Sequence, residues 1–474
     1  MRDQNSKSIE GKQKGLNVYQ AAQAFVSTII GAGVVTIPYV FAQAGYVVGI
    51  AMHLIMIVAL NFSAYLLLKS REYSGFESFG EIAYFCMGRP SVFITNFIIT
   101  SATSLIVVMY GMLFSKICVS FALNLYGSQY DVTNDTLALI LTSKVFYVFL
   151  LFLILLPFVI KKSIKDLNIA GKFLFFGLTS LIVLLFAKIN FKEQFSSPSD
   201  KVLEPYKQGS LADSVFIVLT AYGFMMSFFS IFSQLQVKKN SNAQKSLFLG
   251  MITCFVIFMA LSVQAVTIYG ENLQPNLFDN IQVETNIPSL IMRVLFLPIF
   301  VFNAPFVFLA GKESLLMLIE DLTSDFISNS IKNRLEYLRN KKSYTLIAGD
   351  MNESSFINAN DDDQDKLANP RVNISDRVSN KIYYSAVIIL FTFQMFLAYM
   401  IDDITIIIGF FTAIAESSVN FILPGLFFIL SSRMTHKKIN ILTLIGSYFY
   451  VILGVSLFFF AMYKNITKIT QLKS

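Results

Sequence analysis

The sequence predicts an all-α integral membrane protein with eleven transmembrane helices. Hydrophobic residues make up 55% of the 474-residue chain and charged residues only 14%, whereas soluble domains carry about 25% charged residues. The mean hydropathy is +0.62. Apolar stretches also recur at about the 20-residue length that a helix needs to cross the hydrocarbon core of a bilayer. Together these observations indicate a multi-pass bundle and exclude a soluble globular fold.

Each apolar stretch is interpreted as one membrane-spanning helix. The third span is long, and the segment just before it, residues 76–88, is amphipathic and predicts a lead-in from the membrane surface. The predicted spans are 18–42, 46–69, 91–125, 143–160, 166–188, 212–236, 245–269, 287–311, 382–400, 404–431 and 438–463.

The distribution of Lys and Arg predicts a cytoplasmic N-terminus. An odd number of spans puts the termini on opposite faces, and cytoplasmic segments then hold 26 Lys and Arg against 7 on the other face. Cytoplasmic loops carry such an excess, and it remains 16 against 7 when the long loop 312–381 is left out. The C-terminus is then extracellular or lumenal. On that face Asn134 and Asn465 lie in N-glycosylation sequences.

Polar segments complete the predicted organisation. Residues 1–17 form a cytoplasmic tail, helices 1–8 fill 18–311, a cytoplasmic loop occupies 312–381, helices 9–11 fill 382–463, and 464–474 form a non-cytoplasmic tail. The loop begins with apolar residues at helical spacing beside Lys and Arg, which predicts a helix on an anionic leaflet or an ordinary surface helix. Its polar remainder is predicted to be disordered.

The first span contains STIIGAGVVTIPY, residues 27–39, which disfavours an unbroken helix. A glycine in mid-helix costs about 1 kcal/mol relative to alanine and an interior proline about 3 kcal/mol. One interpretation is that Gly31 and Gly33 only let a neighbouring helix approach. The surrounding hydroxyls favour a break beside a cavity, because lipid cannot satisfy freed backbone groups. The substrate-binding residues predicted here are Ser27, Thr28, Ile30, Gly31, Ala32, Gly33 and Val34.

The sixth span carries a second, weaker interruption, where Thr, Tyr, Gly and Ser break the apolar run between Thr220 and Ser227. The first and sixth spans hold equivalent positions in two five-helix halves. Inverted-repeat transporters place their broken helices and a midplane site at such positions. The site residues predicted from these later spans are Thr220, Ala221, Tyr222, Gly223 and Asn303, with Met109 and Tyr110 of the third span as further contributors.

Such a break suits a zwitterion. The facing ends of two half-helices carry opposite partial charges of about half an elementary charge. N–H groups near Ala32, Gly33 and Val34 would bind a carboxylate. Carbonyls near Ile29 and Ile30 would accept hydrogen bonds from an ammonium. A free α-amino acid carries both groups close together. The breaks therefore predict a site for free amino acids that needs no buried charge for the substrate backbone.

Three passages of the chain resemble the amino acid/auxin permease family. GAGVVTIPY, residues 31–39, is similar to the G-x-G-[IV]-x-x-[IL]-P-[YF] stretch of its first span, and an Ala-Gly pair follows at 44–45. YGENLQPNLFDNI, residues 269–281, resembles the passage before its eighth span. GFFTAIAESSVNFILPGLFFI, residues 409–429, resembles its tenth span. The resemblance runs from about residue 15 to 463 and implies a five-plus-five inverted repeat with one extra helix and transport of amino acids.

Two departures from the family pattern argue against sodium coupling. Sodium-coupled relatives carry an Asn shortly before the first glycine, where Ser27 stands, and a hydroxyl residue in the eighth span, where Asn303 stands. Lys312 also replaces a usual Arg at the end of that span but keeps the charge.

Glu416, near the middle of the tenth span, is the candidate for proton coupling. A carboxyl at the bilayer centre costs about 2.5–3.5 kcal/mol on insertion scales, which marks it as a functional candidate. The alternative is a hydrogen-bonded carboxyl with a packing role only. His53 would relay protons or simply bond a neighbour, and Lys116 and Arg293 are expected to extend toward the interface.

These features favour a secondary active or facilitative amino acid carrier that works by alternating access, with proton symport preferred. An amino acid sensor that signals through its cytoplasmic segments is the alternative. An enzyme is disfavoured because two histidines and three cysteines form no catalytic or metal-ligand pattern. No cofactor, metal or nucleic acid is expected, and the partners are the amino acid, membrane lipids and a possible proton. The identity of the amino acid, the choice between plasma membrane and lysosomal or vacuolar membrane, and the oligomeric state stay open.

Overall fold

The computed structural model describes residues 15–126, 135–162, 180, 182–186, 204, 206, 211–281, 287–324, 378–437 and 439–473. Within these ranges the regular structure is helical, and one isolated bridge joins Leu16 to Leu235. The all-α fold class predicted from the sequence is confirmed for this part of the chain.

Among the described residues, eight helical stretches are long and apolar enough to cross a membrane, and a bent pair in the first span would make a ninth. A further apolar helix, α7, spans Lys144–Val159 but has only 16 residues. The predicted fifth span, 166–188, lies mostly outside the described residues, so the count of eleven stays a prediction. The eight stretches are Tyr46–Ser74, Arg89–Tyr126, Leu211–Ser233, Asn240–Tyr269, Ser289–Thr323, Asn380–Met400, Ile404–Met434 and Ile441–Gln471.

Most spans correspond to one long helix each. The helices of this kind are α3 (Tyr46–Ser74), α5 (Arg89–Tyr126), α11 (Asn240–Tyr269), α13 (Ile287–Ser324), α18 (Asn380–Met400) and α21 (Ile441–Lys473). Three spans contain a stretch that is not α-helical, so each of them has two α-helical pieces. Their pieces are α1 (Val18–Ile29) with α2 (Ile37–Ala44), α9 (Leu211–Ala221) with α10 (Phe228–Ser233), and α19 (Ile404–Phe411) with α20 (Leu423–Met434).

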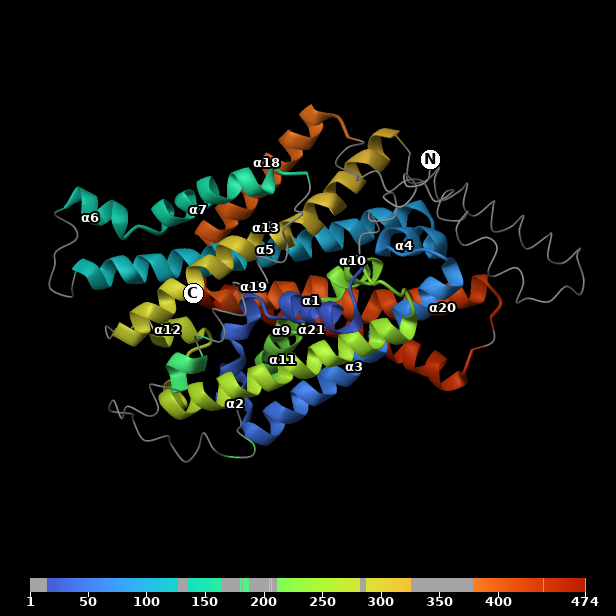
Figure 1. Ribbon diagram of the computed structural model, residues 1–474, viewed down its shortest axis with the longest axis horizontal. Coiled ribbons are helices and arrows are strands. Elements are labelled where there is room, and N and C mark those ends of the chain that lie inside the picture. Colours follow the sequence, from blue (N-terminus) through green and yellow to red (C-terminus); the bar gives the residue numbers. More distant parts are fainter. Residues whose placement is uncertain are drawn as a thin grey trace, which may run out of the picture.

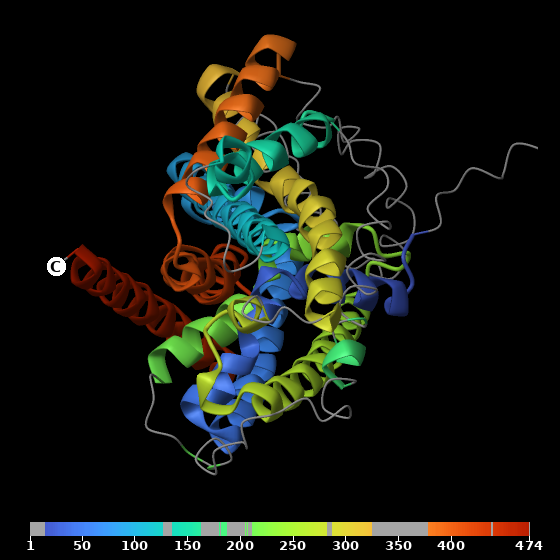
Figure 2. The same cartoon turned by 90° about the vertical axis from the view of Figure 1, so that its left-hand side faces the viewer.

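Two groups of helices enclose the interrupted spans. Figures 1 and 2 show α5, α7, α13 and α18 on one side and α2, α3 and α11 on the other, with α1, α9 and α19 between them. The pair α5 and α13 makes the most extensive helix contact. The backbone breaks therefore lie inside protein, where freed polar groups can be satisfied.

Short helices connect the spans. The predicted lead-in, residues 76–88, contains α4 (Phe79–Met87), whose first turn is capped by the Ser78 side chain accepting from the Glu81 N–H. A second connector, α12 (Leu277–Ile281), precedes α13. α6 (Thr136–Leu141) precedes α7.

The last helix is longer than predicted. α21 continues to Lys473, beyond the predicted span end at 463, so the predicted tail 464–474 is largely helical. Figure 2 shows this helix at the edge of the bundle, with the C-terminus at its free end. Asn465 is 4% exposed and its Nδ2 donates to the Ile406 carbonyl at 3.0 Å, so its sequence matches the glycosylation pattern but its side chain is buried in this structure. Asn134 and most of the long loop lie outside the described residues.

The expectation that Arg293 extends toward the interface is also wrong. Its side chain is 1% exposed and donates to the Ser120 hydroxyl at 2.9 Å and to the Ile281 carbonyl at 2.7 Å. Because α12 ends at Ile281, the guanidinium satisfies a carbonyl that the helix end leaves free. Lys116 is less buried and lies 3.6 Å from an Asp279 carboxylate oxygen.

Candidate functional site

The first span is broken where its glycines predicted. α1 ends at Ile29, a 3-10 segment η1 covers Ala32–Val35, and α2 starts at Ile37, with Pro38 in its first turn, where proline is tolerated. The two halves meet at an angle of 66°. The break therefore turns the chain within the bundle.

Part of the freed backbone in this break is satisfied locally. The Gly31 N–H donates to the Ile29 carbonyl at 2.9 Å, and the Thr36 hydroxyl donates to the Gly33 carbonyl at 2.7 Å. The first N–H groups of a helix have no partner within it. Helix geometry thus gives the N–H groups of Ala32 and Gly33 no partner within the 3-10 segment.

The sixth span is broken as well. α9 ends at Ala221, and the Gly223 N–H donates a hydrogen bond to the Thr220 carbonyl at 3.2 Å. A 3-10 segment η4, Met225–Ser227, then leads into α10. The prediction of two interrupted helices at the first and sixth spans agrees with this geometry.

The two breaks touch at Gly33. A Cβ atom built on Gly33 would lie 2.9 Å from the Cα atom and 3.3 Å from the backbone nitrogen of Ala221. Because both neighbours are backbone atoms, only glycine allows this approach. The contact joins the broken segments of the first and sixth spans.

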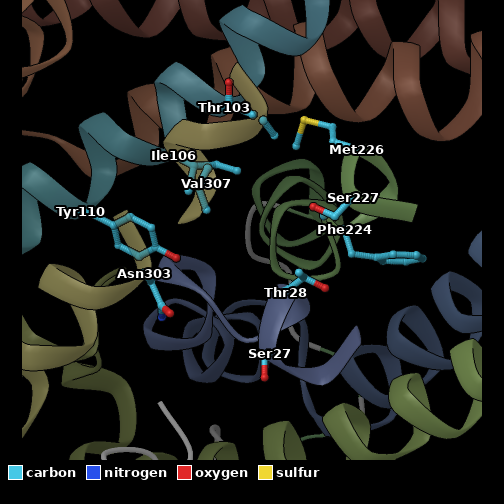
Figure 3. Close-up of a pocket in the computed structure, with 12 residues that line it drawn as sticks. Ser27, Thr28, Thr103, Ile106, Tyr110, Phe224, Met226, Ser227, Asn303 and Val307 are labelled. Carbon is cyan, nitrogen blue, oxygen red and sulfur yellow. The ribbon is translucent and has the colours of Figure 1, made fainter. Parts of the chain in front are cut away.

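A cavity of about 30 Å³ opens beside the breaks. Figure 3 shows the residues around it, which come from α1, α5, α13 and the connection between α9 and α10. The lining residues are Ser27, Thr28, Thr103, Ile106, Tyr110, Gly223, Phe224, Met226, Ser227, Asn303, Val307 and Ala310. None of these is charged, and most polar groups in the set are hydroxyls.

Four of the predicted site residues line this cavity, namely Ser27, Thr28, Gly223 and Asn303, as does Tyr110. A second, smaller cavity takes three more. Ile30, Gly31 and Val34 line it together with Val35, Phe296, Ile299 and Phe300.

The remaining predicted residues lie in the two breaks or contact neighbouring helices, outside both cavities. Ala221 meets Gly33, and Ala32 lies in the 3-10 segment. The Thr220 hydroxyl lies 3.2 Å from that of Thr412, and the Tyr222 hydroxyl lies 3.1 Å from Nδ1 of His53. These side chains line neither cavity. Met109 is 1% exposed and also lines neither.

The prediction named Tyr110 and Asn303 but missed the other residues of α5 and α13 that complete the cavity. Thr103, Ile106 and Tyr110 follow one another at spacings of three and four residues on α5. Asn303, Val307 and Ala310 do so on α13. Such spacing places residues on one face of a helix. The signal is present in the sequence, but apolar faces at the same spacing occur along every span.

Asn303 is the polar side chain of this cavity with unused hydrogen-bonding capacity. It is 7% exposed, and its Nδ2 has no hydrogen-bond partner within the described part of the chain. A buried donor without a partner costs about 1–3 kcal/mol. A ligand acceptor in the cavity would recover that cost.

The tenth span opens in a way that the sequence analysis did not predict. Between α19 and α20 the chain forms a π-helical segment η6, Thr412–Ile422. Glu416 lies within it, is 2% exposed, and accepts a hydrogen bond from the Asn420 amide. Its other carboxylate oxygen lies so close to Gly223 that a Cβ atom on that residue would clash with it. The candidate proton site therefore contacts the break in the sixth span directly.

The ion pairs around these spans lie at their ends. Lys468 lies 2.8 Å from an Asp403 carboxylate oxygen, and the same carboxylate caps α19 by accepting from the Thr405 N–H at 2.8 Å. Burial alone would raise the pKa of Asp403, but the hydrogen bonds from Lys468 and Thr405 outweigh it and hold that pKa below its usual value.

The family model described as transmembrane amino acid transporter protein matches residues 14–467. The chain belongs to this family. The resemblance drawn from the first, eighth and tenth spans is thereby confirmed, and with it the general activity of amino acid transport. A comparison with curated proteins finds no match.

In this conformation the cavity is too small for the substrate of an amino acid transporter. One water molecule needs about 10–15 Å³ of space, so about 30 Å³ has room for only a few waters and not for an amino acid. The helices around the breaks must separate before a substrate can enter.

Proposed function

We propose that this protein carries free amino acids across a membrane by alternating access, coupled to protons. The observation that supports the proposal best is the contact between two broken spans, Gly33 against Ala221, beside a polar cavity with no charged lining residue. A break at this depth is tolerated only where it faces protein or a water-filled cavity.

The substrate would be held mainly by backbone groups. The N–H groups of Ala32 and Gly33 would bind its carboxylate, since the start of a helical segment attracts anions. Carbonyls near Ile29 and Ile30 would accept from its ammonium. Asn303 would add a side-chain hydrogen bond, because its Nδ2 is buried without a partner among the described residues.

Glu416 would load and release the proton. Its contact with Gly223 supports this role, because a change in the charge or position of the carboxyl would alter the interactions of the backbone at the break of the sixth span. A neutral, protonated carboxyl tolerates this buried position better than a carboxylate does. Protonation and closure of the site would then favour each other.

The arrangement of the spans follows the same proposal. Breaks in the first and sixth spans support a five-plus-five inverted repeat with one extra helix. The excess of Lys and Arg supports a cytoplasmic N-terminus in a plasma, lysosomal or vacuolar membrane.

The test is uptake of a panel of labelled amino acids by the purified protein in liposomes, with pH and sodium gradients imposed separately. We expect uptake to rise when the pH gradient drives protons in the direction of transport. A sodium gradient should leave uptake unchanged. Uptake driven by sodium alone would refute proton coupling. Saturable binding without any flux would instead favour the sensor.

A further inference from the structure

The site consists of two cavities of different character, stacked along α13. The larger one carries hydroxyl and amide groups, whereas the smaller, about 10 Å³, is lined by aliphatic and aromatic side chains and Gly31. Phe296, Ile299 and Phe300 face the smaller cavity, and Asn303 lies one turn further along the same helix. The two cavities are therefore neighbours, since one helical turn rises about 5.4 Å.

Tyr110 forms the wall between them. Its side chain lines the larger cavity, yet its hydroxyl would lie 2.9 Å from a Cβ atom on Gly31, and its ring centre lies 5.9 Å from that of Phe300. Gly31 and Phe300 both line the smaller cavity. A single buried ring, 3% exposed, thus touches the boundary of both spaces.

We propose that the smaller cavity is an apolar subsite for the side chain of the transported amino acid, and that Tyr110 limits which side chains reach it. The inference builds on the proposed function, with the amino acid backbone held at the break of the first span. With the ring in place, short side chains such as those of alanine and serine fit. Branched and aromatic side chains, as in leucine and phenylalanine, must displace it.

The lining supports this division of roles. Ile30, Val34, Val35 and Ile299 offer only aliphatic surface, and Phe296 and Phe300 add aromatic rings. Burial of a hydrocarbon side chain against such an apolar wall is favourable. Burial of a charged side chain there is unfavourable, because the wall offers it no hydrogen bond or opposite charge. The substrates admitted by removal of the ring are therefore large and apolar.

The experiment measures competing uptake of alanine and leucine into the same liposomes, so that the ratio does not depend on the amount of active protein. In Tyr110→Ala the leucine-to-alanine ratio is expected to rise by about tenfold or more, the discrimination that a single methylene in an apolar pocket provides. Tyr110→Phe keeps the ring and is expected to keep the wild-type ratio.

Phe114→Ala is the matched control. Phe114 lies one turn from Tyr110 on α5, is 5% exposed, and lines neither cavity. The Phe114→Ala variant loses a buried ring but does not connect the two cavities, so its leucine-to-alanine ratio should stay unchanged. A similar rise in Phe114→Ala would show that general loosening, and not the wall, changes selectivity, and would overturn the proposal.

A second variant should change the leucine-to-alanine ratio in the opposite direction. It tests the proposal even if Tyr110→Ala does not fold. Ile299→Phe fills the smaller cavity and is expected to lower uptake of leucine relative to alanine. An unchanged ratio in the folded variants, with transport intact, overturns the subsite but leaves the carrier function standing. Wild-type protein that neither binds nor moves any amino acid would overturn both.

Discussion

The first and tenth spans both open near the site, but by different means. In the first span the chain leaves helical geometry at Ile30 and Gly31, and the segments Val18–Ile29 and Gly33–Ala44 meet at 66°. In the tenth span the helix stays continuous and only widens into the π-helical segment η6, which contains no glycine or proline. The first opening exposes backbone groups, and the second presents a carboxyl, that of Glu416.

The difference shows two ways to place polar groups at mid-membrane. A break offers N–H groups with partial charge and requires residues that allow close contact, as Gly33 does against Ala221. A π-helical segment keeps its backbone bonded and re-aims side chains, and such segments often occur at functional sites. Variants of each region should therefore fail differently, the first by loss of all transport and the second by loss of coupling.

The largest effect is expected at the contact between the two breaks. In Gly33→Val the new side chain meets the Ala221 backbone, which cannot move aside without shifting α9. Overpacking of this kind costs about 1–3 kcal/mol, and it acts on the site itself. We expect uptake in liposomes to fall at least about tenfold, since 1.4 kcal/mol corresponds to a factor of ten.

Gly49→Ala is the control for this variant. The three atoms nearest to a Cβ atom on Gly49 all belong to the ring of Phe41, the closest at 3.0 Å, and a side chain can shift where backbone cannot. Its uptake should stay near the wild-type value. Normal transport by folded Gly33→Val would show that close approach of the two breaks is not needed.

A smaller but more specific effect is expected from Glu416→Gln. The amide keeps a polar group beside Asn420 but cannot exchange a proton. With one proton moved per amino acid, a pH step of one unit supports about tenfold accumulation, because it is worth about 1.4 kcal/mol. The variant should lose this accumulation and keep exchange of amino acid across the membrane.

Glu320→Gln serves as its control, because Glu320 is also a buried glutamate, 5% exposed, but lies on α13 outside both cavities. Its accumulation should follow the pH step as in the wild type. If Glu416→Gln still accumulates substrate against the pH step, the carboxyl has only a packing role.

Asn303→Ala should weaken binding without stopping transport. One hydrogen bond contributes about 0.5–1.5 kcal/mol net, so the half-saturating concentration should rise several-fold while the maximal rate changes little. Asn96→Ala is matched to it, because Nδ2 of Asn96 is also buried without a partner among the described residues but lines neither cavity. An equal change in both variants would remove Asn303 from the site.

The smallest effect is expected at the entrance of the tenth span. Asp403→Asn keeps a capping side chain for α19 but loses the pair with Lys468, which is partly exposed and worth about 0.2–1 kcal/mol. Because the folded pKa is lowered, the stabilisation is present above the usual pKa of 3.8 and is lost as the pH falls through the lower folded value. Thermal unfolding should show a small difference at neutral pH that disappears in acid. A difference that grows in acid would contradict this assignment.

The backbone chemistry of the site was encoded locally. Gly31, Gly33 and Pro38 disfavour a continuous helix wherever they occur, so the break in the first span and the membership in the family could be recognised from the sequence. Glu416 could be singled out for a similar reason, because a carboxyl within an apolar span is costly in any fold. Both inferences needed only the residue and its neighbours in the chain.

The meeting of side chains from different helices was decided only by tertiary structure. Arg293 is buried because the Ile281 carbonyl and Ser120 come within reach, and Tyr222 faces His53 and not the cavity. The widening of η6, the wall formed by Tyr110 and the length of α21 likewise depend on packing between spans. All spans share similar apolar faces, so the sequence does not specify which faces meet. That choice arises when the helices pack and satisfy their few polar groups together.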